Sequence, residues 1–282
     1  MDVVSSQQKL RKYGDLTMRL GYYLKVFGQM AKLALATILE YRVDAVVRSF
    51  YMFAYISGTL LLINTVFTQT NFLGGFDYNE IMLMYASMMV MWALMETFFF
   101  DGFKYFVLYD IRNGDFDKTL IKPVNPLFLL SISKFRIESA LIGVVMMCVF
   151  LYYASLNLSS ITFVSAVIYL GFFILGIYIH YRVFTCYASL AFFMTKASQA
   201  LRTLQSASDQ CFYPTIIYPW PVGLVFFTLL PIALAAYVPV SFLLNRGSFL
   251  LLGGTLLVAI GSTLLSSYLW KMGLQQYSSA SS

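Results

Sequence analysis

The stretch GSFLLLGGTLLVAIGSTLLSSYLW, residues 247–270, carries no charged side chain and is followed at once by Lys271. A helix of about 20 such residues spans the hydrocarbon core of a bilayer and satisfies its own backbone hydrogen bonds. Trp270, at the end of the stretch, suits the membrane interface, where aromatic side chains are enriched. The stretch therefore predicts a transmembrane helix near the end of the chain.

Five further stretches have the same apolar character. They are residues 49–67, 81–100, 139–158, 161–179 and 211–245. The last is longer than one crossing requires but contains five prolines, which break helices, so it predicts one span and a re-entrant piece. The composition agrees, since 60% of the 282 residues are hydrophobic and 11% are charged. We predict an all-α integral membrane protein with six transmembrane helices at residues 43–272.

The basic residues are distributed unequally between the connecting segments. Of the 19 lysines and arginines, 18 lie in residues 1–48, 103–138 and 180–209 or at Lys271, which leaves only Arg246 for the other side. Because basic residues are retained in the cytoplasm, both termini are expected there, including segment 1–18 and a tail at 273–282. The positive charges lie between apolar blocks, which favours the lipid bilayer as partner and argues against nucleic acid.

Residues 19–42, before the first span, have a different pattern. Apolar side chains recur at helical spacing, while Lys25 and Lys32 occupy other faces of the helix. We predict an amphipathic helix lying along the cytoplasmic interface. The alternative, an additional span, would place Lys25, Lys32 and Glu40 in the bilayer at a high cost.

The loop at residues 109–126 predicts a short cytoplasmic helix. Asp115 can cap a helix that starts at Phe116 and ends before Pro123. Phe116 and Leu120 share one face of that helix, and we expect this face to dock into the groove of a partner. A polar turn between two spans is the alternative interpretation.

Ionisable groups in the predicted spans are few. Glu96 and Asp101 are expected to form a structural ion pair rather than a substrate site, and the available cations are Lys104, Lys134 and Arg136. The single histidine, His180, lies at the end of a predicted span, where an anchoring role at the interface is expected.

The sequence contains no phosphate-binding Gly-x-x-x-x-Gly-Lys-Ser/Thr loop. We therefore expect no catalytic residue and no bound nucleotide, metal or other cofactor on this chain. A passive channel or ion-coupled transporter would need a conduction or proton-coupling constellation, and the spans carry almost no charge at mid-membrane. An intramembrane enzyme would need a convergent cluster of acid, base or metal-binding groups, and no such cluster is visible.

Nearly the whole chain resembles a known family, the permease subunits of the type-2 superfamily of ATP-binding-cassette exporters, in a bacterial branch. The most specific part of the resemblance comprises Arg112, Gly114, Asp115, Asp117, Leu120, Lys122, Pro123 and Pro126. These residues are similar to the family's segment between the second and third spans. Pro231 and Pro239, which precede the last span, support the resemblance.

The resemblance implies that residues 112–123 form a coupling helix that docks on a separate cytoplasmic ATPase, which would bind ATP and Mg. The coupling residues would be Arg112, Gly114, Asp115, Phe116, Asp117, Leu120, Lys122 and Pro123. It also implies that residues 230–245 are a re-entrant outer hairpin. Export across the bacterial cytoplasmic membrane would require a second permease chain, either identical or related, and the related heterodimer is favoured.

The substrate path would run along the interface between the two permease chains, lined by the first, second and fifth spans. Candidate lining residues are Tyr55, Asn64, Met88, Met91 and Tyr218. Many Met, Phe and Tyr side chains would suit a hydrophobic or amphiphilic cargo, but core and lipid packing explains them equally well.

Overall fold

The computed structural model describes residues 16–40, 42–194, 197, 199, 202, 219–228, 234 and 236–277, and these residues are almost entirely helical. Five helical segments are long and apolar enough to cross a membrane: Val46–Gln69, Tyr78–Asn113, Ile137–Leu156, Phe163–Phe192 and Phe249–Gln276. The prediction of an all-α protein with long apolar helices is confirmed, and five of the six predicted stretches lie in these segments.

Part of the predicted stretch at residues 211–245, namely 211–218, 229–233 and 235, lies outside the described residues. Two short helices are described within it, α12 (Trp220–Thr228) and α13 (Tyr237–Leu243). The sixth span and the re-entrant hairpin therefore stay predictions, and Tyr218 and Cys211 also lie outside the described residues.

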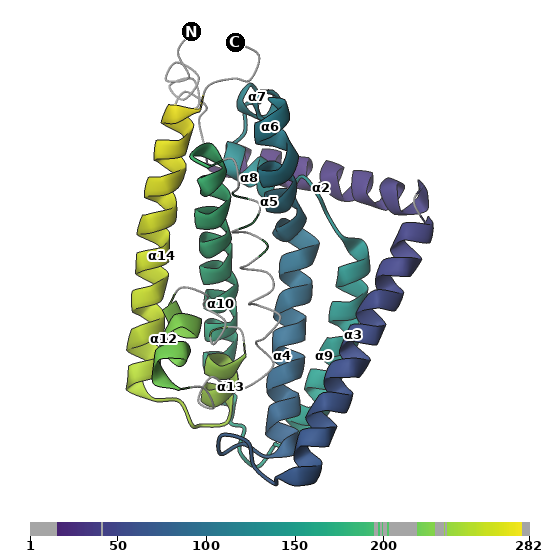
Figure 1. The fold of residues 1–282 in the computed structure, drawn as a ribbon, viewed down its shortest axis with the longest axis vertical. Coiled ribbons are helices and arrows are strands. Elements are labelled where there is room, and N and C mark those ends of the chain that lie inside the picture. Colours follow the sequence, from purple (N-terminus) through teal and green to yellow (C-terminus); the bar gives the residue numbers. More distant parts are fainter. Residues whose placement is uncertain are drawn as a thin grey trace.

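The helix α4 (Tyr78–Met95) is the central element of the bundle (Figure 1). Nearly all of its side chains are buried, including a run of methionines that fill the space between the surrounding helices. It packs against α9 (Ile137–Leu156), while α10 (Phe163–Ser189) packs against α13 and α14 (Phe249–Gln276). By contrast, α3 (Arg42–Gln69) lies at the edge of the bundle and exposes most of its apolar side chains.

The second membrane-crossing segment is much longer than a bilayer requires. After α4 it continues through η1 (Glu96–Phe100), α5 (Asp101–Tyr105), η2 (Phe106–Asp110) and α6 (Ile111–Asn113), and both η1 and η2 are π-helical. Its 36 residues extend for roughly 50 Å, whereas the hydrocarbon core is about 30 Å thick. This segment is therefore long enough to extend beyond the hydrocarbon core.

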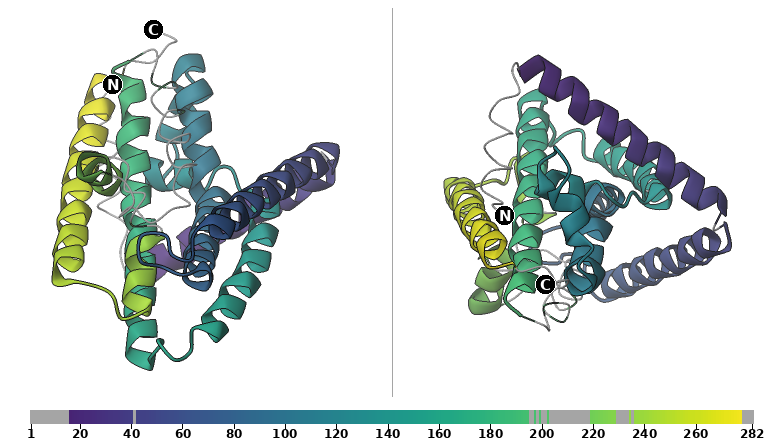
Figure 2. Two further views of the ribbon diagram at one scale, coloured as in Figure 1. Left: turned by 60° about the horizontal axis from the view of Figure 1, so that its bottom comes forward. Right: turned by 90° about the horizontal axis from the view of Figure 1, so that it is seen from above.

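The first described helix, α2 (Leu16–Glu40), lies across the bundle at a steep angle to the long helices (Figures 1 and 2). Its inner side packs through Tyr23 on Phe128, with ring centroids 4.7 Å apart, and through Phe27 on Phe135, 5.0 Å apart. Leu24 is 61% exposed. A helix with one side on the protein and apolar side chains open on another side fits the predicted placement along a membrane interface.

Candidate functional site

The predicted coupling loop lies at the end of the bundle where α14 ends (Figure 1), and we call this the α7 end. Gly114 has φ +73°, a left-handed conformation that glycine adopts without strain, and it ends α6. The helix α7 (Phe116–Leu120) follows. The Asn125 side chain then caps α8 (Pro126–Ser131) by accepting a hydrogen bond of 2.9 Å from the Leu127 amide. The loop therefore consists of the short helices α7 and α8, which follow the turn at Gly114.

The helix predicted at residues 116–120 is confirmed, but the predicted cap by Asp115 is wrong. Asp115 has helical backbone angles, φ −66° and ψ −19°, and its side chain makes no capping hydrogen bond. Its carboxylate instead accepts a hydrogen bond of 2.6 Å from the Lys118 ammonium, and this bond raises the pKa of Lys118. Asp115 therefore binds a side chain one turn away, in competition with the amides of the first turn.

Phe116 points into the protein and is completely buried. Its ring is surrounded by four other rings, with centroid distances of 5.0 Å to Phe106, 5.8 Å to Phe192, 6.2 Å to Trp270 and 5.3 Å to Tyr277. We call these five residues the aromatic cluster. It joins α7 to η2, to η3 (Leu190–Phe192) at the end of α10, and to the end of α14.

The burial of Phe116 disagrees with the prediction that it contacts a partner, because a docking contact must be accessible. Leu120 is half-buried against the core. Ile121 is 83% exposed, more than the other exposed large apolar residue of the loop, Tyr109 at 50%, and Lys118, Lys122 and Pro123 are exposed near it in the sequence. We call Ile121 and these last three residues the exposed edge. Spacing of four residues placed Phe116 and Leu120 on one face but did not indicate that this face is the inner one.

Two other predicted coupling residues lie on α6 and α7. Arg112 is exposed on α6, and Asp117 is half-buried on α7. The helix α8 packs against both α7 and α5. Its approach to α5 is so close that a Cβ atom at Gly102 of α5 would lie 2.1 Å from the carbonyl oxygen of Leu130 of α8. The eight predicted coupling residues lie within residues 112–123, and the short helix α8 packs against this segment.

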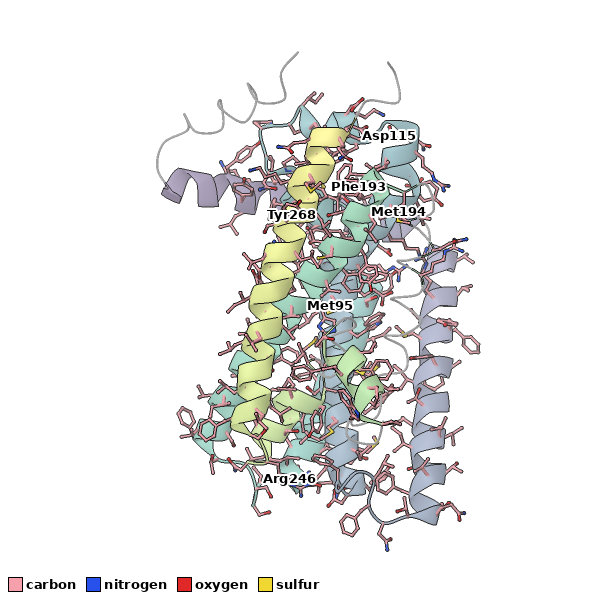
Figure 3. The ribbon with its side chains drawn as sticks, turned by 60° about the vertical axis from the view of Figure 1, so that its left-hand side comes forward. Met95, Asp115, Phe193, Met194, Arg246 and Tyr268 are labelled. Carbon is pink, nitrogen blue, oxygen red and sulfur yellow. The ribbon has the colours of Figure 1, made fainter. Side chains whose placement is uncertain are left out.

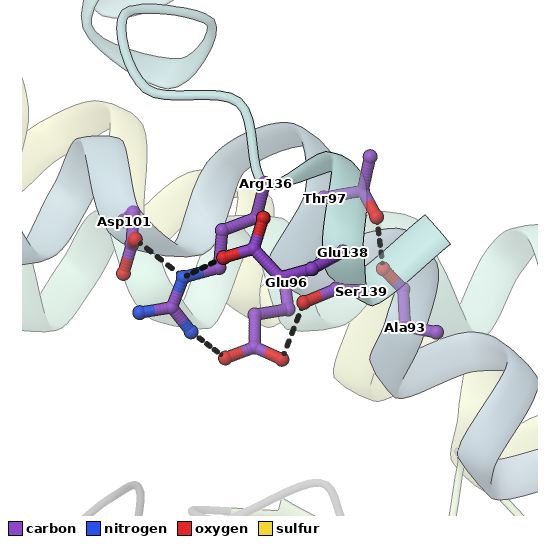
Figure 4. A network of polar contacts seen from close by, with 7 residues as sticks. All are labelled: Ala93, Glu96, Thr97, Asp101, Arg136, Glu138 and Ser139. Carbon is purple, nitrogen blue, oxygen red and sulfur yellow. Dashed lines mark hydrogen bonds and ion pairs between the residues drawn. The ribbon is translucent and has the colours of Figure 1, made fainter. Parts of the chain in front are cut away.

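A buried group of charges lies beside this end, between η1 and the start of α9 (Figure 4). Arg136 forms an ion pair with Glu96, a second with Asp101 at 2.8 Å, and a longer contact of 3.8 Å with Glu138. The Ser139 hydroxyl donates to Glu96 at 3.0 Å. The predicted structural ion pair is confirmed, and Arg136 is the cation, because it enters between the two carboxylates that flank η1.

The other candidate residues for pairing or anchoring lie elsewhere. Lys134 stands over the Tyr105 ring, 4.6 Å from its centroid. His180 is buried, with Nδ1 2.9 Å from the carbonyl oxygen of Gly176, so the predicted interfacial role is wrong. Its face of α10 is turned toward the core rather than toward the membrane surface.

The four described candidates for the substrate path do not share one surface. Met88 and Met91 are buried in the core around α4, and Tyr55 is half-buried. Asn64 is exposed and lines an open polar groove of about 540 Å³ with Asp77 and neighbouring residues, at the opposite end from α7. The structure therefore separates the two methionines, which pack inside the chain, from Asn64 at the rim.

The end opposite α7 is closed by contacts between two loops. Arg246 pairs with Glu80 at 2.6 Å and donates to the carbonyl oxygen of Gly75 at 2.9 Å. Asp77 and Glu80 form a capping box at the start of α4. Figure 3 shows Arg246 and Asp115 at opposite ends of the molecule. Arg246, the basic residue that the charge distribution left for the non-cytoplasmic side, therefore lies at the end away from α7.

These features define a multi-pass α-helical membrane protein whose second long helix carries an ordered helical segment beyond one end of the bundle. The family model described as ABC-2 family transporter protein matches residues 53–281. This is most of the chain, and the protein belongs to the ABC-2 transporter family. No curated protein and no solved structure matches it.

Proposed function

We propose that the chain is the permease subunit of an ATP-driven exporter and that a separate ATPase docks on the exposed edge. The observation that carries this proposal is the position of Ile121, which is 83% exposed at the tip of an ordered loop in an ABC-2 family chain. A large apolar side chain there has no evident role inside the chain. ATP and Mg are bound by the ATPase, because this sequence has no phosphate-binding loop.

The exposed edge has the chemistry of a docking surface. Ile121 supplies the apolar anchor, Lys122 adds a positive charge next to it, and Lys118 forms an ion pair with Asp115 at the same edge. A complementary groove on the ATPase would be apolar in its centre and acidic at its rim, because buried anchors supply most of the affinity and rim charges orient the partners. Docking at this end requires the α7 end, and both termini, to face the cytoplasm of a bacterial cell.

The aromatic cluster would transmit movement of α7 to the rest of the permease. Phe116 contacts Trp270 and Tyr277 at the end of α14 and Phe106 on the second long helix. A displacement of α7 by the ATPase would therefore displace two membrane helices directly. A ligand shifts a conformational equilibrium only through different affinities for the two states, so the ATPase must bind α7 more tightly in one of its positions.

The exporter would contain a second permease chain, identical or related, alongside α3. Phe50 and Phe53 of α3 are 72% and 68% exposed, as expected of a helix that faces lipid or a second chain. The substrate would pass between the two chains, and Asn64 lies near the outer end of that path. Burial makes Met88 and Met91 weaker candidates for its lining than Asn64.

The test is co-purification of the ATPase with tagged variants of the chain from native membranes. Ile121→Asp should abolish recovery of a stoichiometric ATPase, while the conservative Ile121→Leu should retain it. Equal insertion of both variants into the membrane is the control for folding. Full recovery of the ATPase with Ile121→Asp would refute docking at the exposed edge.

The alternative is a passive channel or an ion-coupled transporter that works without an ATPase. ATP-independent flux through the purified chain in proteoliposomes, together with recovery of the chain alone from gently solubilised membranes, would favour it over the exporter.

A further inference from the structure

Arg182 is a charged residue on a membrane-crossing helix without an acidic partner among the described residues. It lies on α10, and its Nη2 donates to the carbonyl oxygen of Thr263 at 2.7 Å and to the Ser267 hydroxyl, both on α14. It also stands over the Tyr178 ring, 6.0 Å from the centroid. None of these groups is anionic, and the Nε–H of Arg182 is buried with no hydrogen-bond partner. The guanidinium is thus tied to α14, and no carboxylate among the residues that the structure describes pairs with it.

The depth of this residue places it near one surface of the hydrocarbon core. Arg182 comes 19 residues after Phe163, the first residue of α10, which corresponds to about 28 Å along the helix. Ser267, its partner on α14, comes 18 residues after Phe249, or about 27 Å. Because the hydrocarbon core is about 30 Å thick, both helices independently place the guanidinium at the level of the lipid headgroups.

A second cation lies beside the first. Lys271 follows Ser267 by one helical turn, so the two residues share a face of α14. Lys271 is exposed and, like Arg182, pairs with no carboxylate of the described residues. On the same side of α14, Leu264 is 67% exposed, and Tyr268, labelled in Figure 3, is 62% exposed. Two cations therefore lie above an apolar surface that is open on the outside.

We propose that the seam between α10 and α14 binds the headgroup of one anionic phospholipid of the inner leaflet. Arg182 and Lys271 would attract the phosphate by their charge, and an acyl chain would lie along Leu264. Guanidinium groups bind phosphate through paired hydrogen bonds, and basic pockets between membrane helices are suited to anionic headgroups. The site rests on the proposed function only for the assignment of the leaflet.

The occupant follows from charge and depth together. A free inorganic phosphate would satisfy the two cations but would leave the apolar strip below them unused. A zwitterionic lipid would satisfy the strip but would bring a positive group close to Arg182 and Lys271. An anionic phospholipid matches both features, since attraction of anionic headgroups to basic side chains is worth about 1 kcal/mol for each Lys or Arg.

The test is native mass spectrometry of the full chain, with any subunits that co-purify, in detergent containing equal amounts of phosphatidylglycerol and phosphatidylcholine. The wild type should retain one phosphatidylglycerol with a preference of about tenfold or more. The double variant Arg182→Gln with Lys271→Gln should lose the preference. The matched control, Lys25→Gln with Lys32→Gln, removes the same charge from exposed positions of α2 and should keep it.

Three results would overturn the proposal. The first is an unchanged preference in the double variant, and the second is an equal loss in the α2 control, which would indicate general attraction of anionic lipid to a basic protein. The third is displacement of the bound lipid by millimolar inorganic phosphate, which would indicate a simple anion site. If Arg182→Gln fails to fold, Lys271→Gln alone, at an exposed position, should still weaken the preference. None of these measurements depends on recovery of the ATPase, so this proposal and the exporter assignment can fail separately.

Discussion

Replacement of Phe116 by alanine should release α7 from the bundle without removing the surface proposed to bind the ATPase. The Phe116 side chain is completely buried and contacts four aromatic rings. Truncation of a buried phenylalanine costs about 3–5 kcal/mol. This end of the molecule projects beyond the expected hydrocarbon core, so the exposed ring surface meets water and the full cost applies to local opening of α7.

Amide hydrogen exchange measured by mass spectrometry on peptides covering residues 114–126 tests this estimate. The amides of Lys118 and Ile121 donate to the backbone carbonyls of Asp115 and Asp117, at 3.1 and 3.2 Å, and should exchange through opening of this segment. Because each 1.4 kcal/mol is a factor of ten, exchange in Phe116→Ala should accelerate about a hundredfold or more. Peptides from α9 should not change.

Ile121→Ala is the matched control, since it removes a similar apolar side chain from an exposed position, where substitutions usually change stability by about 0.5 kcal/mol or less. It should leave exchange nearly unchanged but weaken co-purification of the ATPase. Phe116→Ala should do the reverse, with faster exchange and largely retained binding. Unchanged exchange in Phe116→Ala, or equal acceleration in both variants, would refute the assignment of the aromatic cluster as the anchor of α7.

Two further predictions concern the neighbouring charged groups. Arg136→Gln should lower the midpoint of thermal unfolding strongly, because loss of one partner of a buried ion pair costs about 3–5 kcal/mol. The control is Glu138→Gln, since the Glu138 carboxylate lies 3.8 Å from Arg136 Nε and its loss should cost less. Equal melting curves for the two variants would contradict this prediction. Burial and the adjacent Asp117 carboxylate raise the pKa of Tyr277 to about 12, from 10 in the unfolded chain. Protection of α7 amides should therefore be constant below pH 10 and fall between pH 10 and 12, and Tyr277→Phe should remove this step if ionisation of the phenol is the cause.

The long helices could be predicted from the sequence because the thickness of the bilayer fixes the length of each uncharged run. The helix α7 was predicted by a local argument, since Pro123 limits it at one end, although the cap expected from Asp115 at the other end is not formed. The pairing of Glu96 and Asp101 with a cation could be predicted from the cost of buried charge, although the choice of Arg136 depended on the close approach of α9 to η1.

The orientation of α7 could not be predicted in the same way. A helix of five residues has two sides, and periodicity does not indicate which side faces the protein. Two of the four ring partners of Phe116, Trp270 and Tyr277, are more than 150 residues away in the sequence, and their aromatic character alone fitted a membrane interface equally well. The extension of the second helix to Asn113 was missed because polar residues interrupt the apolar run after Phe100.

The second long helix contains two π-helical segments, η1 and η2, before α7. Such segments often occur at functional sites and can be points at which a helix bends. The contacts argue for transmission as one unit instead. Arg136 binds Glu96 at the start of η1 and Asp101 just after it, so rotation within η1 would break two buried ion pairs. Phe106 joins η2 to Phe116, so η2 and α7 share one aromatic core. A force on the exposed edge would therefore move α7 and the second long helix together. If the proposed ATPase docks there, weakening either the ion pairs or the aromatic cluster should uncouple it from the membrane helices.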